Sequence, residues 1–75
     1  MSRVQLHYDD DSKIDFNDKG DALYHLKAQG YAGVVELRNE QDGKVVYSRK
    51  QLLDLLARAA EHGYDTRADL NKLEG

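Results

Sequence analysis

The sequence predicts an α+β fold in two layers, in which helices cover one face of a four-stranded antiparallel sheet. Three observations support this prediction. Each half of the chain has two segments of polar–apolar alternation around turn residues, each such pair is followed by a helical pattern, and the two halves resemble each other. The expected order is a duplicated ββα-ββα unit followed by a short third helix at the C-terminal end.

The resemblance between the halves lies in residues 4–31 and 35–64. Val4, Leu6, Asp11, Lys13 and Lys19 recur 31 residues later as Val35, Leu37, Asp42, Lys44 and Lys50, and Gly30-Tyr31 recurs as Gly63-Tyr64. An internal repeat of this kind constrains the architecture. It says little about chemistry, because the recurring positions are those that strands, turns and helix ends need in order to fold.

The bounds of the elements follow from the alternation and from turn and cap residues. They are strands at 3–8 and 13–16, a helix from about 18 to 29, strands at 32–38 and 44–47, a helix from about 49 to 62 and a short helix after Thr66. Residues 9–12 are three Asp and a Ser, which favour tight turns because their side chains bond the local backbone. Ser48 and Gln51 form a capping box. Gly30 and Gly63 stand where a helix ends in a residue with positive φ.

The alternation also assigns the two faces of the sheet. The face beneath the helices is expected to carry Val4, Leu6, Tyr8, Ile14, Phe16, Val35, Leu37, Val45 and Tyr47. The open face is expected to carry Arg3, Gln5, His7, Lys13, Asp15, Val34, Glu36, Arg38, Lys44 and Val46. An antiparallel sheet needs to bury only one face, so the other is left for solvent or for a partner.

Length, charge and composition exclude several classes of protein. A chain of 75 residues predicts one domain over 1–75, with residues 65–75 as a helical tail. The net charge of −3, with interleaved signs, disfavours a strongly basic nucleic-acid binder. We expect a cytoplasmic protein with no signal peptide and no membrane contact, because Cys is absent and no segment approaches the ~20 apolar residues of a membrane span.

Residues that could carry chemistry do not form a recognisable arrangement. The acidic run at 9–11 suggests a calcium loop, but no register of it supplies the ligands that an EF-hand needs. His7, His25 and His62 are far apart in the sequence, and no Cys offers a nucleophile. We therefore expect no catalytic residue, no metal site and no cofactor, and an enzyme that uses His7 or His25 with the acidic run ranks last.

The surface pattern instead favours a binding module. The residues assigned to a partner or nucleic-acid surface are Arg3, His7, Lys13, Val34, Arg38, Lys44 and Val46. Leu52, Leu53 and Leu56 are assigned to self-association, unless the short third helix covers them.

The sequence thus predicts a small non-enzymatic protein-interaction or regulatory accessory module that associates with itself, for example as a homodimer, or with a protein partner. The alternative is a weak nucleic-acid-binding protein that uses the basic residues of the open face. The strand aromatics are expected on the other face, which disfavours this alternative, because single-strand binders stack bases on aromatic side chains.

Overall fold

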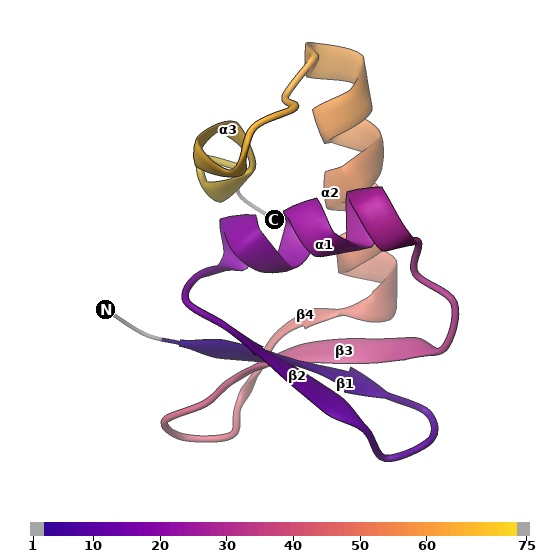
Figure 1. Cartoon of the computed structure of the whole chain (residues 1–75), viewed down its shortest axis with the longest axis vertical. Coiled ribbons are helices and arrows are strands. Elements are labelled where there is room, and N and C mark those ends of the chain that lie inside the picture. The colour runs from indigo at the N-terminus through magenta and orange to yellow at the C-terminus, as the bar shows by residue number, and fades with distance from the viewer. Residues whose placement is uncertain (1–2, 74–75) are drawn as a thin grey trace.

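The computed structural model describes residues 3–73 and shows the expected ββα-ββα order with a third helix (Figure 1). The strands are β1 (Val4–Tyr8), β2 (Lys13–Phe16), β3 (Val34–Asn39) and β4 (Val45–Ser48). The helices are α1 (Lys19–Gln29), α2 (Arg49–His62) and α3 (Arg67–Asn71). The predicted fold class is confirmed. The ends of the predicted domain and of its tail, residues 1–2 and 74–75, lie outside the described residues.

The sheet has the strand order β2-β1-β3-β4, and all neighbouring strands are antiparallel. The inner strand of each unit therefore pairs with the inner strand of the other, and β2 and β4 form the two edges. Leu6 pairs directly with Leu37, its counterpart 31 residues later. Antiparallel pairing of two equivalent residues relates the two hairpins by an approximate two-fold rotation through this pair. The origin of the units by duplication stays a prediction.

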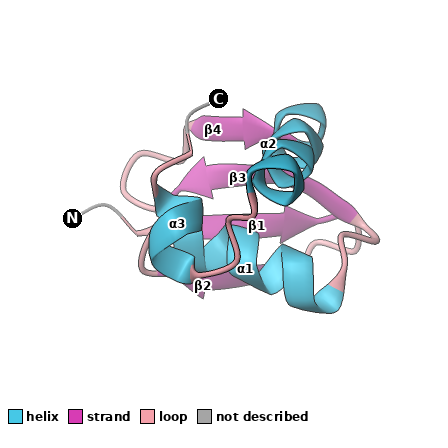
Figure 2. Ribbon diagram, turned by 90° about the horizontal axis from the view of Figure 1, so that it is seen from above, coloured by secondary structure: helices cyan, strands magenta, loops and turns pink. Residues whose placement is uncertain are grey.

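All the helices lie on one side of the sheet, α1 over the β1–β2 half and α2 over the β3–β4 half (Figure 2). Helix α3 packs chiefly against α1. The buried apolar residues come from both layers: Val4, Leu6, Ala22, Leu23, Leu26, Val34, Leu37, Leu52, Leu55, Ala59, Leu70 and Leu73. The core thus lies between the helices and one sheet face, and the other face is left open.

Local signals set the helix ends where the sequence predicts them. The carboxylate of Asp18 accepts a hydrogen bond from the amide three residues on, at 2.9 Å, and so caps α1. Ser48 and Gln51 form both bonds of the capping box. The Thr66 side chain caps α3 in the same way as Asp18, at 3.1 Å. Gly63 ends α2 in the left-handed conformation, with φ 69°.

A β-bulge in β3 overturns part of the predicted assignment of faces. The pairing of β1 with β3 shifts between His7 and Tyr8, so Tyr8 pairs with Val34. Val34 was expected on the open face but is buried, with 3% of its surface exposed. Val35 was expected beneath the helices but is 43% exposed. A bulge inserts one extra residue, here in the N-terminal part of β3, so the residues there lie on the opposite side from the one that unbroken alternation assigns.

A second bulge, between Leu37 and Arg38, pairs Arg38 with Val45 on edge strand β4. The expectation that Val45 lies beneath the helices is therefore also wrong, since it is 51% exposed. Ile14 pairs with Leu6 as an inward-facing residue should, yet it is 38% exposed. Its strand, β2, has a neighbour on one side only, so the core covers Ile14 incompletely.

Candidate functional site

The surface predicted from the sequence on the open sheet face is only partly assembled. Two cross-strand rows form it, Lys13, His7 and Glu36 in one and Asp15, Gln5 and Arg38 in the next. Arg3, Lys44 and Val46 are exposed near its margins. Val34 lies in the core, so its assignment to this surface is wrong.

Acidic neighbours neutralise two of the predicted cations. Nε of Arg38 donates to the Glu36 carboxylate, and Nε of Arg3 lies 3.6 Å from the Glu40 carboxylate. The strand aromatics pack against the core on the other side of the sheet: Tyr8, Phe16 and Tyr47. The open face therefore has few unpaired cations to bind phosphates, and these rings are not available on it for bases to stack on.

The leucines predicted for self-association on α2 are also used mostly within the fold. Leu52 is 1% exposed and belongs to the core, so its assignment to an interface is wrong. Leu53 and Leu56 are half-buried, and Leu56 packs against the core. These two side chains offer only a narrow apolar strip.

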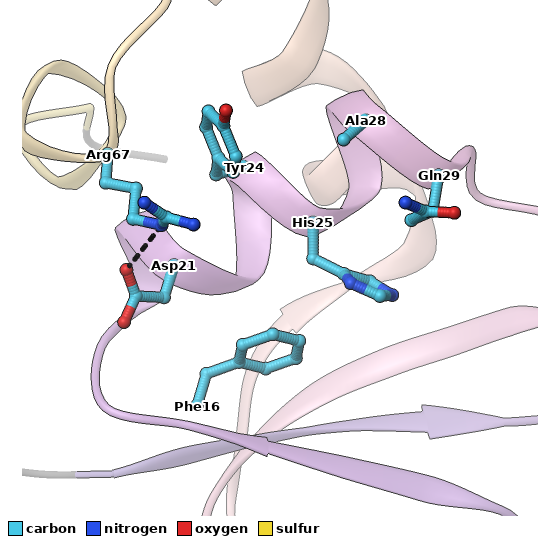
Figure 3. A pocket seen from close by; sticks show the side chains of 7 residues that line it. All are labelled: Phe16, Asp21, Tyr24, His25, Ala28, Gln29 and Arg67. Atoms are coloured by element: carbon cyan, nitrogen blue, oxygen red, sulfur yellow. Dashed lines mark ion pairs between the residues drawn. The ribbon is translucent and has the colours of Figure 1, made fainter.

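The structure shows a hollow on the outward side of α1 that the sequence did not reveal (Figure 3). It has a volume of about 320 Å³ and is lined by Phe16, Asp21, Tyr24, His25, Ala28, Gln29 and Arg67. A second hollow of about 330 Å³ is lined by Tyr24, Lys27, Ala28 and Asp65. Tyr24 and Ala28 line both hollows, so the two hollows are neighbours. Together they are called the α1 groove below.

The α1 residues of the groove share one face of the helix. Residues 21, 24, 25, 28 and 29 recur at the three- and four-residue steps that align side chains along a helix. The face buried in the core is carried by other residues: Ala22, Leu23 and Leu26. Helix α1 therefore has a second face, of which only Tyr24 also packs against the core.

Rings and a guanidinium shape the middle of the groove. His25 points toward Phe16, and their ring centroids are 5.3 Å apart (Figure 3). The guanidinium of Arg67 lies over the Tyr24 ring, 4.3 Å from its centroid. Nε of Arg67 is also 3.4 Å from the Asp21 carboxylate. Tyr24 and Arg67 hold each other in place while both remain accessible, which preorganises a surface for contact.

An ion pair stands at each end of the groove. Asp21 and Arg67 form the pair at the N-terminal end of α1. At the C-terminal end, the Lys27 ammonium pairs with the Asp65 carboxylate and lies 3.4 Å from the Tyr64 carbonyl oxygen. Both bases and both acids lie at the rim, so the groove carries no net charge.

Gly20 allows α3 to lie close enough to complete the groove. Its amide donates to Oδ1 of Asn71 at 3.3 Å. A Cβ atom at Gly20 would lie 2.5 Å from the carbonyl oxygen of Arg67 and 2.7 Å from Cβ of Asn71. Real side chains do not tolerate such distances, so only glycine permits this approach of α3 to α1.

The acidic hairpin tip forms a closed turn. The backbone amide and hydroxyl of Ser12 donate to the Asp10 carboxylate and hold the pKa of Asp10 below its usual value. Burial, and secondarily the charge of Asp10, raise the pKa of the Tyr8 phenol.

Among residues 3–73, no group of three His, Cys, Asp or Glu side chains is placed to hold a metal ion.

The three histidines remain apart in the fold. His7 lies in the open sheet face, where its Nε2 atom is buried and has no hydrogen-bond partner among the described residues. His25 lines the α1 groove, and His62 at the end of α2 lies against the Tyr64 ring, at 5.6 Å between centroids. The predicted candidates therefore do not form one site.

Comparisons with protein-family models, with curated proteins and with solved structures gave no match. Within residues 3–73, none of the helices is both long and apolar enough to cross a membrane. The structure itself defines the class of the protein as a small α+β domain with an open groove beside α1.

Proposed function

We propose that this chain is a non-enzymatic protein-interaction domain that binds its partner through the α1 groove. The observation that carries this proposal is the pair of half-buried Tyr24 and exposed Arg67, set beside the Phe16–His25 rings in a preformed hollow. Tyr and Arg are among the side chains that contribute most to the free energy of protein interfaces, above all where they are preorganised and surrounded by a polar rim.

An accessory or regulatory role in the cytoplasm is part of this proposal. It is supported by the small size of the chain and by the absence of Cys, which suits a reducing compartment. The charged side chains of the groove are engaged in ion pairs and His25 contacts Phe16, which favours recognition over chemistry.

Substitution in the groove is expected to remove the partner, whereas the same substitution on the open sheet face is not. Ala28→Arg places a long cation in the groove at an exposed helix position, where Arg is well tolerated. Val46→Arg places the same side chain on edge strand β4, at a position that is 37% exposed. The measurement is quantitative affinity capture from the native host with wild type and both variants, after circular dichroism shows that all three are folded.

We expect Ala28→Arg alone to lose the proteins that wild type captures. If Ala28→Arg retains all of them, the groove is not the binding surface, and the proposal is wrong. If Val46→Arg alone loses the captured proteins, the binding surface is the open sheet face and the proposal is wrong.

Nucleic-acid binding by the open sheet face is the second candidate function, because Lys13, Lys44 and Arg38 lie on or beside that face. We expect no saturable binding of single- or double-stranded oligonucleotides at low salt, since Arg38 is paired with Glu36. Fluorescence anisotropy over a salt series measures this. A salt-sensitive affinity that falls in Arg38→Ala would make this second function the correct one.

A further inference from the structure

We propose that the outer edge of β2 pairs with the same edge of a second copy of this chain, so that the two sheets join into one. The two β2 strands run antiparallel, and a two-fold axis perpendicular to the sheet passes between the two Ile14 residues. Each copy then presents the same surface to the other, as in most homodimers. The inference also names a partner for the α1 groove, and in that respect it rests on the proposed function, because Phe16 of β2 lines that groove.

The backbone of β2 has free hydrogen-bonding groups along its outer edge. The Tyr8 amide donates to the carbonyl oxygen of Ser12 at 2.9 Å, which sets the phase of the ladder between β1 and β2. Because hydrogen-bonded pairs alternate in an antiparallel ladder, the even-numbered residues of β2 turn their backbone groups toward β1. The N–H and C=O groups of Lys13 and Asp15 therefore point to the outer edge, where no residue among 3–73 bonds them.

These free groups restrict the register of an antiparallel contact. Within β2 only Lys13 and Asp15 can bond across the edge, so each must face one of these two residues in the second copy. The available registers place Lys13 opposite Lys13, Asp15 opposite Asp15, or Lys13 opposite Asp15. In the last of these Ile14 lies on the axis, and both facing pairs exchange their N–H and C=O groups, as hydrogen-bonded pairs do within a sheet.

The side-chain charges single out this last register. Lys13 and Asp15 are exposed and lie on the open face of the sheet, opposite His7 and Gln5 of β1. With Ile14 on the axis, Lys13 of each copy faces Asp15 of the other. Opposite charges directly across an antiparallel pair are stabilising, whereas like charges there are destabilising. The other two registers each oppose like charges, so the strand specifies its own partner and register.

Both charged side chains are available for the contact. Among residues 3–73, Lys13 forms no ion pair. Asp15 accepts a hydrogen bond from Nε2 of Gln5 at 2.8 Å on one carboxylate oxygen. Its other oxygen is left to accept from Lys13 of the second copy. The contact therefore breaks no interaction within either copy.

Ile14 supplies the apolar centre of the contact. It faces the helices, yet it is 38% exposed, because β2 has a neighbouring strand on one side only. On the axis the two Ile14 residues form a non-hydrogen-bonded pair, in which side chains lie closest together. Each then covers the surface that the core of its own copy leaves exposed. A core in so short a chain gives limited stability, to which this burial would add.

The helix layer continues across the joined sheet with the spacing that it has in one copy. Helix α1 lies over β1 and β2, and α2 lies over β3 and β4, so neighbouring helices are two strands apart (Figure 2). Across the axis the two α1 helices are again two strands apart, or about 10 Å, which is a usual distance between packed helices. The rotation keeps all helices on one side, so α1 of the second copy lies beside the α1 groove.

The β4 edge competes poorly for the same role. The Ser48 amide, at the end of that strand, already donates to Oε1 of Gln51 at 2.9 Å. The bulge at Arg38–Val45 also interrupts the regular ladder, whereas the pairing of β2 with β1 has no such shift. Strand-to-strand association needs a row of free backbone groups, which these two features of β4 shorten.

Charge-swapped variants test the inference directly. The acidic variant is Lys13→Glu and the basic variant is Asp15→Lys. In each variant alone both facing pairs repel, whereas in a mixture of the two both pairs attract. Analytical ultracentrifugation of wild type, of each variant and of an equal mixture measures the association, after circular dichroism shows that all are folded. Lys44→Glu, an exposed position just before β4, is the matched control.

We expect a wild-type dimer, self-association weakened about tenfold or more in each variant, and a heterodimer in the mixture. Lys44→Glu should dimerise like wild type. The inference is wrong if wild type remains monomeric up to about 1 mM, the limit of weak association. It is also wrong if the variants dimerise as well as wild type, or if the mixture associates no better than each variant alone.

Amide hydrogen exchange, measured by NMR on wild type, tests the strand contact without any substitution. The amides of Lys13 and Asp15 should exchange about tenfold or more slowly at concentrations where the dimer forms than after dilution to monomer. The Ile14 amide bonds within one copy and is the internal reference. A dimer in which the Lys13 and Asp15 amides still exchange at the monomer rate would contradict the inference.

Failure of this inference can be told from failure of the proposed function. If wild type is monomeric but Ala28→Arg still loses captured proteins, the groove binds a different protein, and only the identity of the partner is wrong. If the Lys13 and Asp15 amides are protected in a dimer but Ala28→Arg retains all captured proteins, the β2 contact is correct and the function proposed for the groove is wrong.

Discussion

An aspartate at position 34 is expected to unfold the protein, whereas an aspartate at the neighbouring position 35 is not. Val34 is 3% exposed and lies in the core, while Val35 is 43% exposed. An unpaired carboxylate in a core costs several kcal/mol, comparable with the roughly 5 kcal/mol that stabilises a small domain. At position 35 the carboxylate stays hydrated, and the cost should be about 1 kcal/mol or less.

Urea titrations followed by circular dichroism measure both changes. Val34→Ala offers a milder version, with an expected loss of about 2 kcal/mol, in case the aspartate variant does not accumulate. Alternation without a bulge predicts the opposite pattern. Unfolding of Val35→Asp together with a stable Val34→Asp would therefore contradict the pairing of Tyr8 with Val34.

Gly20→Ala is expected to destabilise the protein, although alanine is the better helix former. Helix propensity alone favours the change by about 1 kcal/mol. The new Cβ atom would lie 2.5 Å from the Arg67 carbonyl oxygen, so α3 must move and Leu70 must leave its buried position in part. We expect a net loss of about 2 kcal/mol from this overpacking.

Thermal unfolding measures this prediction, with Gln29→Ala as the control at an exposed position of the same helix. The control should change stability by about 0.5 kcal/mol or less. Because α3 carries Arg67, folded Gly20→Ala should also bind a partner at the α1 groove more weakly than wild type. A Gly20→Ala variant more stable than wild type would show that α3 does not press on α1.

The features that the sequence predicted correctly depend on neighbours within a few residues. The cap at Ser48, the end of α2 at Gly63 and the turn after Tyr8 use side chains and amides at most four or five positions apart. Such interactions can be predicted from a sequence because the residues that make them lie only a few positions apart. The order of elements followed from them.

The two bulges could not be predicted in this way, because they arise where distant strands meet. Val34 turns inward in a segment held by Arg49, whose Nη1 donates to the carbonyl oxygens of Val34 at 2.8 Å and Tyr31 at 3.2 Å. This contact joins residues 15 and 18 positions apart. Alternation assumes an uninterrupted pleat and therefore gave the wrong face to both valines of this segment.

The α1 groove could not be predicted from the sequence, because it too depends on contacts between distant segments. Its wall includes Arg67, which reaches Tyr24 from α3 only because Gly20 admits that helix. One feature of the sequence did point to a second contact face on α1. Tyr24 and Ala28 are apolar residues four positions apart on the side of α1 opposite to its buried residues, which indicates a helix with two contact faces.

The pairing of Leu6 with Leu37 at the centre of the sheet has a consequence for how the chain acquires its fold. Each ββα unit has its inner strand stabilised by the other unit, so neither unit contains a finished sheet. A single hairpin is marginal in water, and its inner strand would present a bare edge. The loop from Leu6 to Leu37 must therefore close before burial compensates for the lost chain entropy. During synthesis the first unit is therefore expected to become stable only once the second has been made, so that the two halves fold together.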